Sequence, residues 1–510
     1  TLYSNTTGDY NTALGLEALY SNTQSTNNVA LGYKALYGNT VASNNVAIGA
    51  FALTGENTNG DNVAIGYSAL RNNSSGTKNL AIGTLSLTNN TSGSDLTGVG
   101  HQALYSNTSG KDNTALGSQA LYSNTTGESN TALGLTSLNS NTTGSYNTAT
   151  GLRALYSNTA GRFNSAFGYN SLYSNTTGER NSSFGYQSLF SNTTGLYNNA
   201  FGYQALNSNT TGSYNAAFGR DALFANTTGA KNAAFGYQAL AVNTTGSFNL
   251  AAGYQTLTSN TTGASNSAIG FQALALNTTG SYNQALGPLA LSGNTTGSYN
   301  VAIGDSALYA NTTGSFNTAL GDRTLYANST GEYNSGIGMK ALFTNTTGSY
   351  NAATGYTSLY SNTTGDYNVA SGTSALFSNT TGSYNVAMGA NSLFDNTTGA
   401  ENTGIGLEAL QSNTTGSYNT ALGLKAGYSN TTGSNNVFIG YKAGYNETGS
   451  NKLYISNNAS SNLITGDFSS GALSLGQTSG TVSVLNNFDV DGTSNLDDVN
   501  IDGTVSLNGT

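Results

Sequence analysis

The sequence predicts an all-β fold, a parallel β-solenoid or β-roll built from coils of 17 residues. Glycine occupies every seventeenth position from Gly15 to Gly440, 26 positions in succession, and no insertion interrupts this register before Asn430. A repeat of constant length is typical of a solenoid, in which each coil contacts only its neighbours. Seventeen residues rich in Gly, Asn and Thr would make a poor helix, so short strands and turns are expected.

The composition favours an ordered chain. Charged residues make up 7% of the sequence, against about 25% in a typical soluble domain. The chain nevertheless has 33 Tyr and 18 Phe at regular positions, whereas disordered chains are poor in aromatic residues. The net charge is −9 and there is no basic stripe, so nucleic acid is not an expected partner. The sequence has no Cys for a thiolate metal site and no run of 18 apolar residues for a membrane span.

Residues that recur every 17 positions form a column along the stacked coils, and each column is named by one of its members. The stretch from Thr12 to Gly15 alternates between two faces of a strand. The Thr12 and Leu14 columns carry the bulkier residues, so they are expected to fill the interior of the coil together with the Leu19 column. The Ala13 and Gly15 columns carry small residues, which predicts close packing against an adjacent strand or against the axis of an oligomer.

Two glycine columns are expected to have different roles. The Gly15 column admits no other residue, including at Gly151, Gly304 and Gly423, which indicates close approach of another segment. The Gly8 column accepts Ser, Ala and Asn in three early coils, which is more typical of a turn residue with positive φ.

Asparagine forms two further columns. One runs from Asn11 through Asn419 with Leu96 as its exception, and the other from Asn5 to Asn430 with Glu56 as its exception. We expect each side-chain amide to bond to its copy one coil away or to cap a turn, which would make two ladders. A direct contact with a sugar or with ice is the functional alternative.

The pattern changes near residue 450. Beyond it, short alternating segments are separated by turns of Asn, Gly and Asp, which predicts further strands. We therefore predict two domains: a solenoid shaft at residues 1–450 and a β-rich C-terminal segment at 451–510, the start of a further shaft or a collar. Since Thr1 is in register with Ala18, the chain is expected to be a window on a longer polypeptide.

Candidate binding residues lie in the variable positions that follow each glycine of the Gly15 column. Several coils carry Tyr-Gln there, and these rows are expected to face outward, where they could stack on sugars. Strand-forming residues that simply face solvent are the alternative. The candidate residues are Tyr186, Tyr203, Tyr237 and Tyr254.

The sequence predicts no catalytic residue and no cofactor, so the chain is not expected to be an enzyme. His101 is the only histidine, and no base accompanies the many Ser and Thr residues. A weak calcium candidate consists of acidic residues at alternating positions, although a terminal Glu is missing and turn-forming acids explain them equally well. These residues are Asp489, Asp491, Asp497 and Asp498. The Asn-Thr-Thr stretches match the N-glycosylation sequon, but turn chemistry also explains them.

The segments NTALG, NVAIG and NAAFG, followed two residues later by Ala-Leu, resemble the head repeats of trimeric autotransporter adhesins. They are also similar to the long NTALG arrays of tail-fibre and surface-fibre proteins of bacteria and phages. The resemblance covers about residues 1–457, although adhesin heads usually have shorter coils. It implies a parallel β-roll in which three chains pack around one axis.

The predicted function is therefore structural. We expect a homotrimeric shaft of a phage tail fibre, an injection-system fibre or a bacterial surface filament, located outside the cell on a virion tail or cell surface and supporting attachment. The alternative is an adhesin whose outward Tyr and Gln rows bind a cell-surface glycan or another receptor. An enzyme such as a depolymerase would need clustered carboxylates, which the repeats lack.

Overall fold

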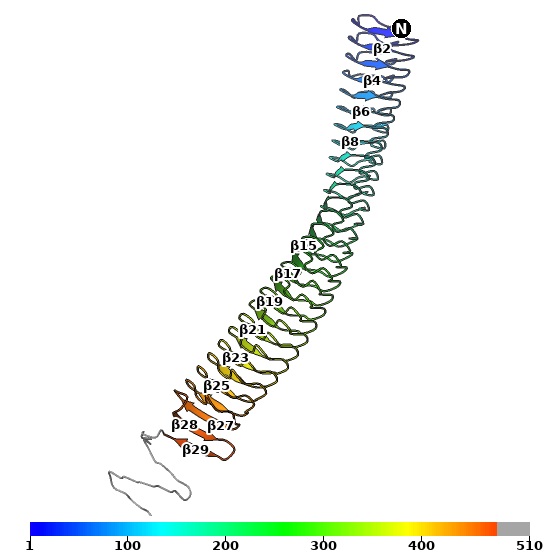
Figure 1. Ribbon diagram of the computed structural model, residues 1–510. Helices are drawn as coiled ribbons and strands as arrows, with labels where there is room; N and C mark the ends of the chain where they lie inside the picture. Colours follow the sequence, from blue (N-terminus) through cyan, green and yellow to red (C-terminus); the bar gives the residue numbers. More distant parts are fainter. Residues whose placement is uncertain (477–510) are drawn as a thin grey trace, which may run out of the picture.

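A computed structural model of the chain describes residues 1–476 and shows a long, curved rod of stacked coils (Figure 1). The described residues contain no helix. Each coil contributes one strand of three residues, and longer strands close the C-terminal end; together they make one sheet of 29 strands. The predicted fold class, an all-β parallel solenoid with a 17-residue repeat, is confirmed.

The coil strands are β1 (Thr12–Leu14), β2 (Val29–Leu31), β3 (Val46–Ile48), β4 (Val63–Ile65), β5 (Leu80–Ile82), β6 (Thr97–Val99), β7 (Thr114–Leu116), β8 (Thr131–Leu133), β9 (Thr148–Thr150), β10 (Ser165–Phe167), β11 (Ser182–Phe184), β12 (Asn199–Phe201), β13 (Ala216–Phe218), β14 (Ala233–Phe235), β15 (Leu250–Ala252), β16 (Ser267–Ile269), β17 (Gln284–Leu286), β18 (Val301–Ile303), β19 (Thr318–Leu320), β20 (Ser335–Ile337), β21 (Ala352–Thr354), β22 (Val369–Ser371), β23 (Val386–Met388), β24 (Thr403–Ile405), β25 (Thr420–Leu422) and β26 (Val437–Ile439). The strands at the C-terminal end are β27 (Lys452–Ser456), β28 (Asn462–Asp467) and β29 (Ala472–Leu475).

Consecutive coils are joined by parallel pairing in constant register. Thr12 lies opposite Val29, and each later coil strand is paired with the next in the same way. Segments outside the strands also bond from coil to coil. The Leu19 amide donates to the Ala35 carbonyl (2.9 Å). Because each coil satisfies its backbone groups through its neighbours, a single coil cannot be stable alone.

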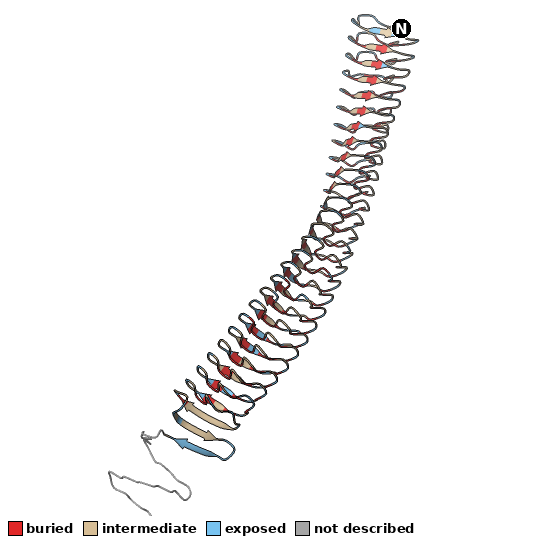
Figure 2. Cartoon of the chain, in the orientation of Figure 1, coloured by how far each residue is buried: buried red, intermediate tan, exposed pale blue. Residues whose placement is uncertain are grey.

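The interior of the coil is narrower than the sequence suggested. The Ala13, Ala18 and Leu19 columns point inward and are buried in almost every coil, which confirms the predicted place of Leu19. The Thr12 and Leu14 columns lie on the outer face of the sheet, so the expectation that they fill the core was wrong (Figure 2). Since the interior already holds these three side chains together with two Asn, no space is left for the bulkier strand residues. The buried Ala13 column also cannot face an oligomer axis.

Three non-glycine columns have left-handed backbone conformations in each coil. The φ angles are 54° at Leu19, 58° at Glu17 and 59° at Tyr10, and they recur along the rod. This region costs an L residue roughly 1–2 kcal/mol. Bonds to the neighbouring coils hold the strained turn in place; for example, the Lys34 amide donates to the Leu16 carbonyl (3.0 Å).

Of the two roles predicted for the glycine columns, one is confirmed and one was wrong. At Gly15, φ is 132° and a Cβ would lie 2.5 Å from the carbonyl oxygen of Gly32, so the expected close approach is confirmed and positive φ is a second constraint. The Gly8 column does not have positive φ, so that expectation was wrong. Its constraint is space, because a Cβ at Gly76 would overlap the carbonyl of Gly93 in the next coil.

The end of the solenoid lies close to the predicted boundary at residue 450. Strand β27 pairs parallel with β26 and extends the stack by one layer. Strands β28 and β29 then add to it in antiparallel order, with Ile455 opposite Ile464. The larger part of the segment predicted as a shaft or collar, residues 477–510, lies outside the described residues, so that assignment stays a prediction.

Candidate functional site

The Asn5 column forms an internal ladder of side-chain amides. Asn226 donates from Nδ2 to Asn209 Oδ1 (2.8 Å) and to the carbonyl of Gly229 (2.9 Å). Its own Oδ1 accepts from Asn243 Nδ2 (2.8 Å). These asparagines are fully buried. The expected ladder is therefore confirmed, and buried amides cannot contact a sugar or ice.

The Asn11 column forms a second ladder with a different bonding pattern. The Asn28 amide donates to Asn11 Oδ1 (3.0 Å), and the Asn419 amide donates in the same way to Asn402 Oδ1 (3.0 Å). Asn419 Nδ2 donates to the Gly433 carbonyl (2.8 Å). Each of these side chains therefore bonds to backbone in an adjacent coil, which marks Asn11 and Asn419 as structural residues.

The four predicted surface-binding tyrosines belong to one continuous stack. The rings of Tyr186 and Tyr203 are stacked with their centroids 5.0 Å apart. Arg220 continues the column, since its guanidinium lies 5.5 Å from the Tyr203 centroid and 5.8 Å from that of Tyr237. The whole stack consists of Tyr169, Tyr186, Tyr203, Arg220, Tyr237, Tyr254 and Phe271.

This stacking limits what the Tyr rows can bind. Tyr186, Tyr203 and Tyr254 are 42–46% exposed, so the rows face outward as expected. Their ring faces, however, are covered by neighbouring rings or by Arg220, which leaves only ring edges and hydroxyls for a sugar. The Gln residues beside them also bond to one another, as Gln204 Nε2 does to Gln187 Oε1 (3.0 Å). The geometry therefore does not favour the adhesin alternative at these rows.

Further aromatic columns, which were not among the predicted sites, run along the rod. Neighbouring rings in them are nearly parallel, with centroids 4.6–5.3 Å apart. Their longest runs are Tyr282, Tyr299, Phe316, Tyr333, Tyr350, Tyr367 and Tyr384; Tyr309, Tyr326, Phe343, Tyr360, Phe377 and Phe394; and Phe167, Phe184, Phe201, Phe218 and Phe235. The signal in the sequence is an aromatic residue repeated at a spacing of 17, because parallel coils in register place such residues about 4.8 Å apart.

The outer face of the sheet is uncharged along the whole solenoid. The first and third residues of β1–β26 include no Asp, Glu, Lys or Arg. Many are apolar and exposed; Leu286 is 48% and Ile303 is 40% exposed. In some strands the sizes of the first and third residues also compensate. The five strands with Phe in third place begin with Ser, Asn or Ala, and β15 reverses the usual order with Leu250 followed by Ala252.

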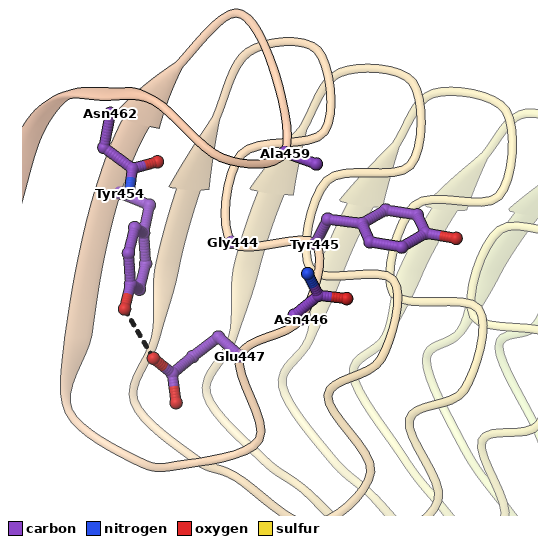
Figure 3. A pocket seen from close by; sticks show the side chains of 7 residues that line it. All are labelled: Gly444, Tyr445, Asn446, Glu447, Tyr454, Ala459 and Asn462. Carbon is purple, nitrogen blue, oxygen red and sulfur yellow. Dashed lines mark hydrogen bonds between the residues drawn. The ribbon is translucent and has the colours of Figure 1, made fainter.

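A polar cluster covers the C-terminal end of the solenoid (Figure 3). The Tyr454 hydroxyl donates to the Glu447 carboxylate (2.6 Å), and Lys452 Nζ donates to Asp467 (2.6 Å). Burial and the bond to Glu447 raise the pKa of Tyr454 to about 12. The Lys452 ammonium, followed by Ser469, holds the pKa of Asp467 well below its usual range. These shifts follow from structural bonds, and the cluster has no nucleophile paired with a base.

Metal and catalytic sites find no support within residues 1–476. That part of the chain has no group of three or more His, Cys, Asp and Glu side chains placed to hold a metal ion. No helix long and apolar enough to cross a membrane was found in the described part of the chain. His101 is exposed in a variable column, as expected. The calcium candidates Asp489, Asp491, Asp497 and Asp498 lie outside the described residues.

The chain was compared with protein-family models, curated proteins and solved structures, and none of them matches it.

Proposed function

We propose that this chain is the shaft of an extracellular fibre, carried on a virion tail or a bacterial cell surface, where it sets the distance between an anchor and a point of attachment. The observation that carries this proposal is the pair of buried Asn ladders. In both, side-chain amides bond one coil to the next along the rod. With about 4.8 Å per coil, 26 coils span on the order of 120 Å. A repetitive rod whose coils are bonded to one another along its length suits a mechanical role.

The shaft assembles as a homotrimer through the outer face of its sheet. An exposed apolar surface that is continuous along the rod is unfavourable in water, and a second and third copy would cover it. The absence of charge from this face supports its packing against another apolar surface. The sequence-based expectation of three chains is thus kept, but the contacting columns are Thr12 and Leu14 in place of Ala13 and Gly15.

Sedimentation of the purified chain tests both parts of the proposal. We expect an elongated particle with a mass of three chains. The double variant Leu286→Glu and Ile303→Glu places charges on the outer face and should give an elongated single chain. The matched control Thr296→Glu, at an exposed turn position, should remain trimeric.

The possible outcomes separate the two claims. A compact single chain would contradict the shaft itself. An elongated single chain for the unmodified protein would leave the shaft intact and overturn the homotrimer. A trimer that persists in the double variant would show that another face mediates assembly.

A further inference from the structure

The Asn5 ladder is interrupted at one place inside the solenoid. Glu56 stands where the register requires Asn, and the next residue, Asn57, turns inward instead and is fully buried. Asn57 Oδ1 accepts from Asn73 Nδ2 (3.1 Å), so the ladder resumes after a shift of one residue. Asn39, on the other side of the break, is fully buried and its Oδ1 has no hydrogen-bond partner.

An aromatic stack ends at the same coil. Tyr20 and Tyr37 are stacked with their centroids 5.4 Å apart, but the next position of that column is Thr54. No aromatic ring therefore covers the second face of Tyr37. The Lys34 ammonium lies 5.2 Å from the Tyr37 centroid and is paired with Glu17 (3.4 Å).

A cavity of about 520 Å³ lies at the coil where the Asn5 ladder is interrupted and the aromatic stack ends. Its lining combines polar groups with apolar surface, and the Glu56 carboxylate makes no hydrogen bond or ion pair within residues 1–476. The Glu56 carboxylate is therefore an acceptor that receives no donor from the described part of the chain. The lining includes Ser21, Tyr37, Thr40, Thr54, Glu56 and Thr58.

A similar break occurs at the C-terminal end of the ladder, where the chain itself supplies a hydrogen-bond donor to the Glu. Asn430 Oδ1 is also buried without a partner, and Glu447 again stands 17 residues further on. The same tetrapeptide, Gly-Tyr-Lys-Ala, precedes both breaks, at 32–35 and 440–443. At the second break, the Tyr454 hydroxyl donates to Glu447 (2.6 Å; Figure 3). Within residues 1–476, no side chain supplies such a hydroxyl to Glu56.

We propose that the cavity at Glu56 binds a hydroxyl-rich ligand of monosaccharide size, the terminal sugar of a glycan. One sugar hydroxyl donates to the Glu56 carboxylate, a charge-assisted bond that is stronger than a neutral one. The apolar face of the sugar packs on Tyr37. Because Glu56 is negative, neutral sugars bind in preference to acidic ones. This site goes beyond the shaft function and does not depend on it.

The test uses the full chain and a panel of methyl glycosides of glucose, galactose, mannose, N-acetylglucosamine, N-acetylgalactosamine and glucuronic acid. Binding is measured by saturation-transfer NMR. We expect transfer to at least one neutral glycoside and none to the glucuronide. Tyr37→Ala should weaken binding about tenfold, the scale of one aromatic contact. Tyr173→Ala, at the equivalent position of a regular coil, should leave binding unchanged.

A repaired coil provides a variant that cannot fail merely by misfolding. The changes give residues 54–60 the sequence of regular coils such as YSNTTGD at 360–366, which restores both the stack and the ladder. They should abolish saturation transfer while thermal stability is kept or raised and the assembly state is unchanged. Transfer that survives the repair, or no transfer to any neutral glycoside, would overturn the proposal. The changes are Thr54→Tyr, Gly55→Ser, Glu56→Asn, Asn57→Thr, Asn59→Gly and Gly60→Asp.

Discussion

The ring of Phe438 occupies the space that a side chain at Gly427 would need, since a Cβ at Gly427 would lie 2.5 Å from Cδ2 of that ring. In regular coils the column of Phe438 holds Ala and the column of Gly427 holds Leu. Gly444 lies against the same ring and makes the same exchange. In the last coils the large side chain has therefore moved from one wall of the core to the other.

Replacing Phe438 should loosen the last coils. Phe438→Ala removes the largest fully buried side chain of the described core and leaves a cavity between two glycines. Such truncations cost about 3–5 kcal/mol. Because each coil contacts only its neighbours, the loss should appear locally. Hydrogen exchange of peptides covering residues 420–456 should show it, whereas peptides from the middle of the rod should exchange as before.

Restoring the regular pair should recover much of that loss. The double variant Phe438→Ala with Gly427→Leu places the large residue back on the usual wall. The backbone permits the change, because φ is 63° at Gly427 and 51° at Leu410, the preceding Leu of that column. Gly427→Leu alone should be destabilising through overlap with Phe438. If both single variants and the double variant lost stability additively, the two sites would be independent and this account of the exchange would be wrong.

The Gly15 column should not tolerate even a methyl group. At Gly151, φ is 127° and a Cβ would lie 2.7 Å from the carbonyl oxygen of Gly168. Gly151→Ala therefore combines backbone strain with overlap, and together they should cost about 2–5 kcal/mol. Exchange should increase in peptides covering residues 134–168. The exposed control Thr143→Ala should stay within about 0.5 kcal/mol of the unmodified chain.

The repeat in the sequence was sufficient to predict coil length, parallel register, the ladders and the inward Leu19 column. It could not decide which face of the strand is internal. Alternation at Thr12, Ala13 and Leu14 defines two faces, and the usual preference for burying bulk pointed to the wrong one. The deciding quantity is the cross-section of a 17-residue coil, which is already filled by its Ala, Leu and Asn side chains. The cross-section depends on how the whole coil closes, so it cannot be inferred from the residue pattern of a single strand.

The candidate sites were predictable to a smaller extent. The outward direction of Tyr203 followed from its variable column, but the covering of its ring by Tyr186 and Arg220 required parallel register at a 17-residue spacing. The break at Glu56 was visible as an exception, whereas the inward turn of Asn57 depends on a local backbone shift. The sequence signal for this inward turn is an Asn directly after the exceptional residue, because that Asn can continue the ladder one residue out of register.

Interior positions of the Asn5 ladder should be more sensitive than its end. Asn226→Ala removes the acceptor of Asn243 and the donor to Asn209, which leaves buried polar groups without partners. Each such group costs about 1–3 kcal/mol. The control Asn430→Ala should cost less, because Asn430 Oδ1 has no partner to lose. Equal losses at both positions, measured by hydrogen exchange of the flanking coils, would argue against a cooperative ladder.

The C-terminal strands should be most stable between mildly acidic and mildly alkaline pH. The pKa of Asp467 is lowered in the folded chain by its bond to Lys452, so its contribution is complete above about pH 4, the unfolded value, and is lost as the pH falls further. The pKa of Tyr454 is raised to about 12, so its contribution is complete below about pH 10 and is lost as the pH rises through 12. Hydrogen exchange of residues 452–475, corrected for the intrinsic rate at each pH, measures both limits. Asp467→Asn should weaken the acidic limit, to which the lowered pKa of Glu447 also contributes, and should leave the alkaline limit set by Tyr454. An unchanged acidic limit would show that Asp467 does not contribute to it.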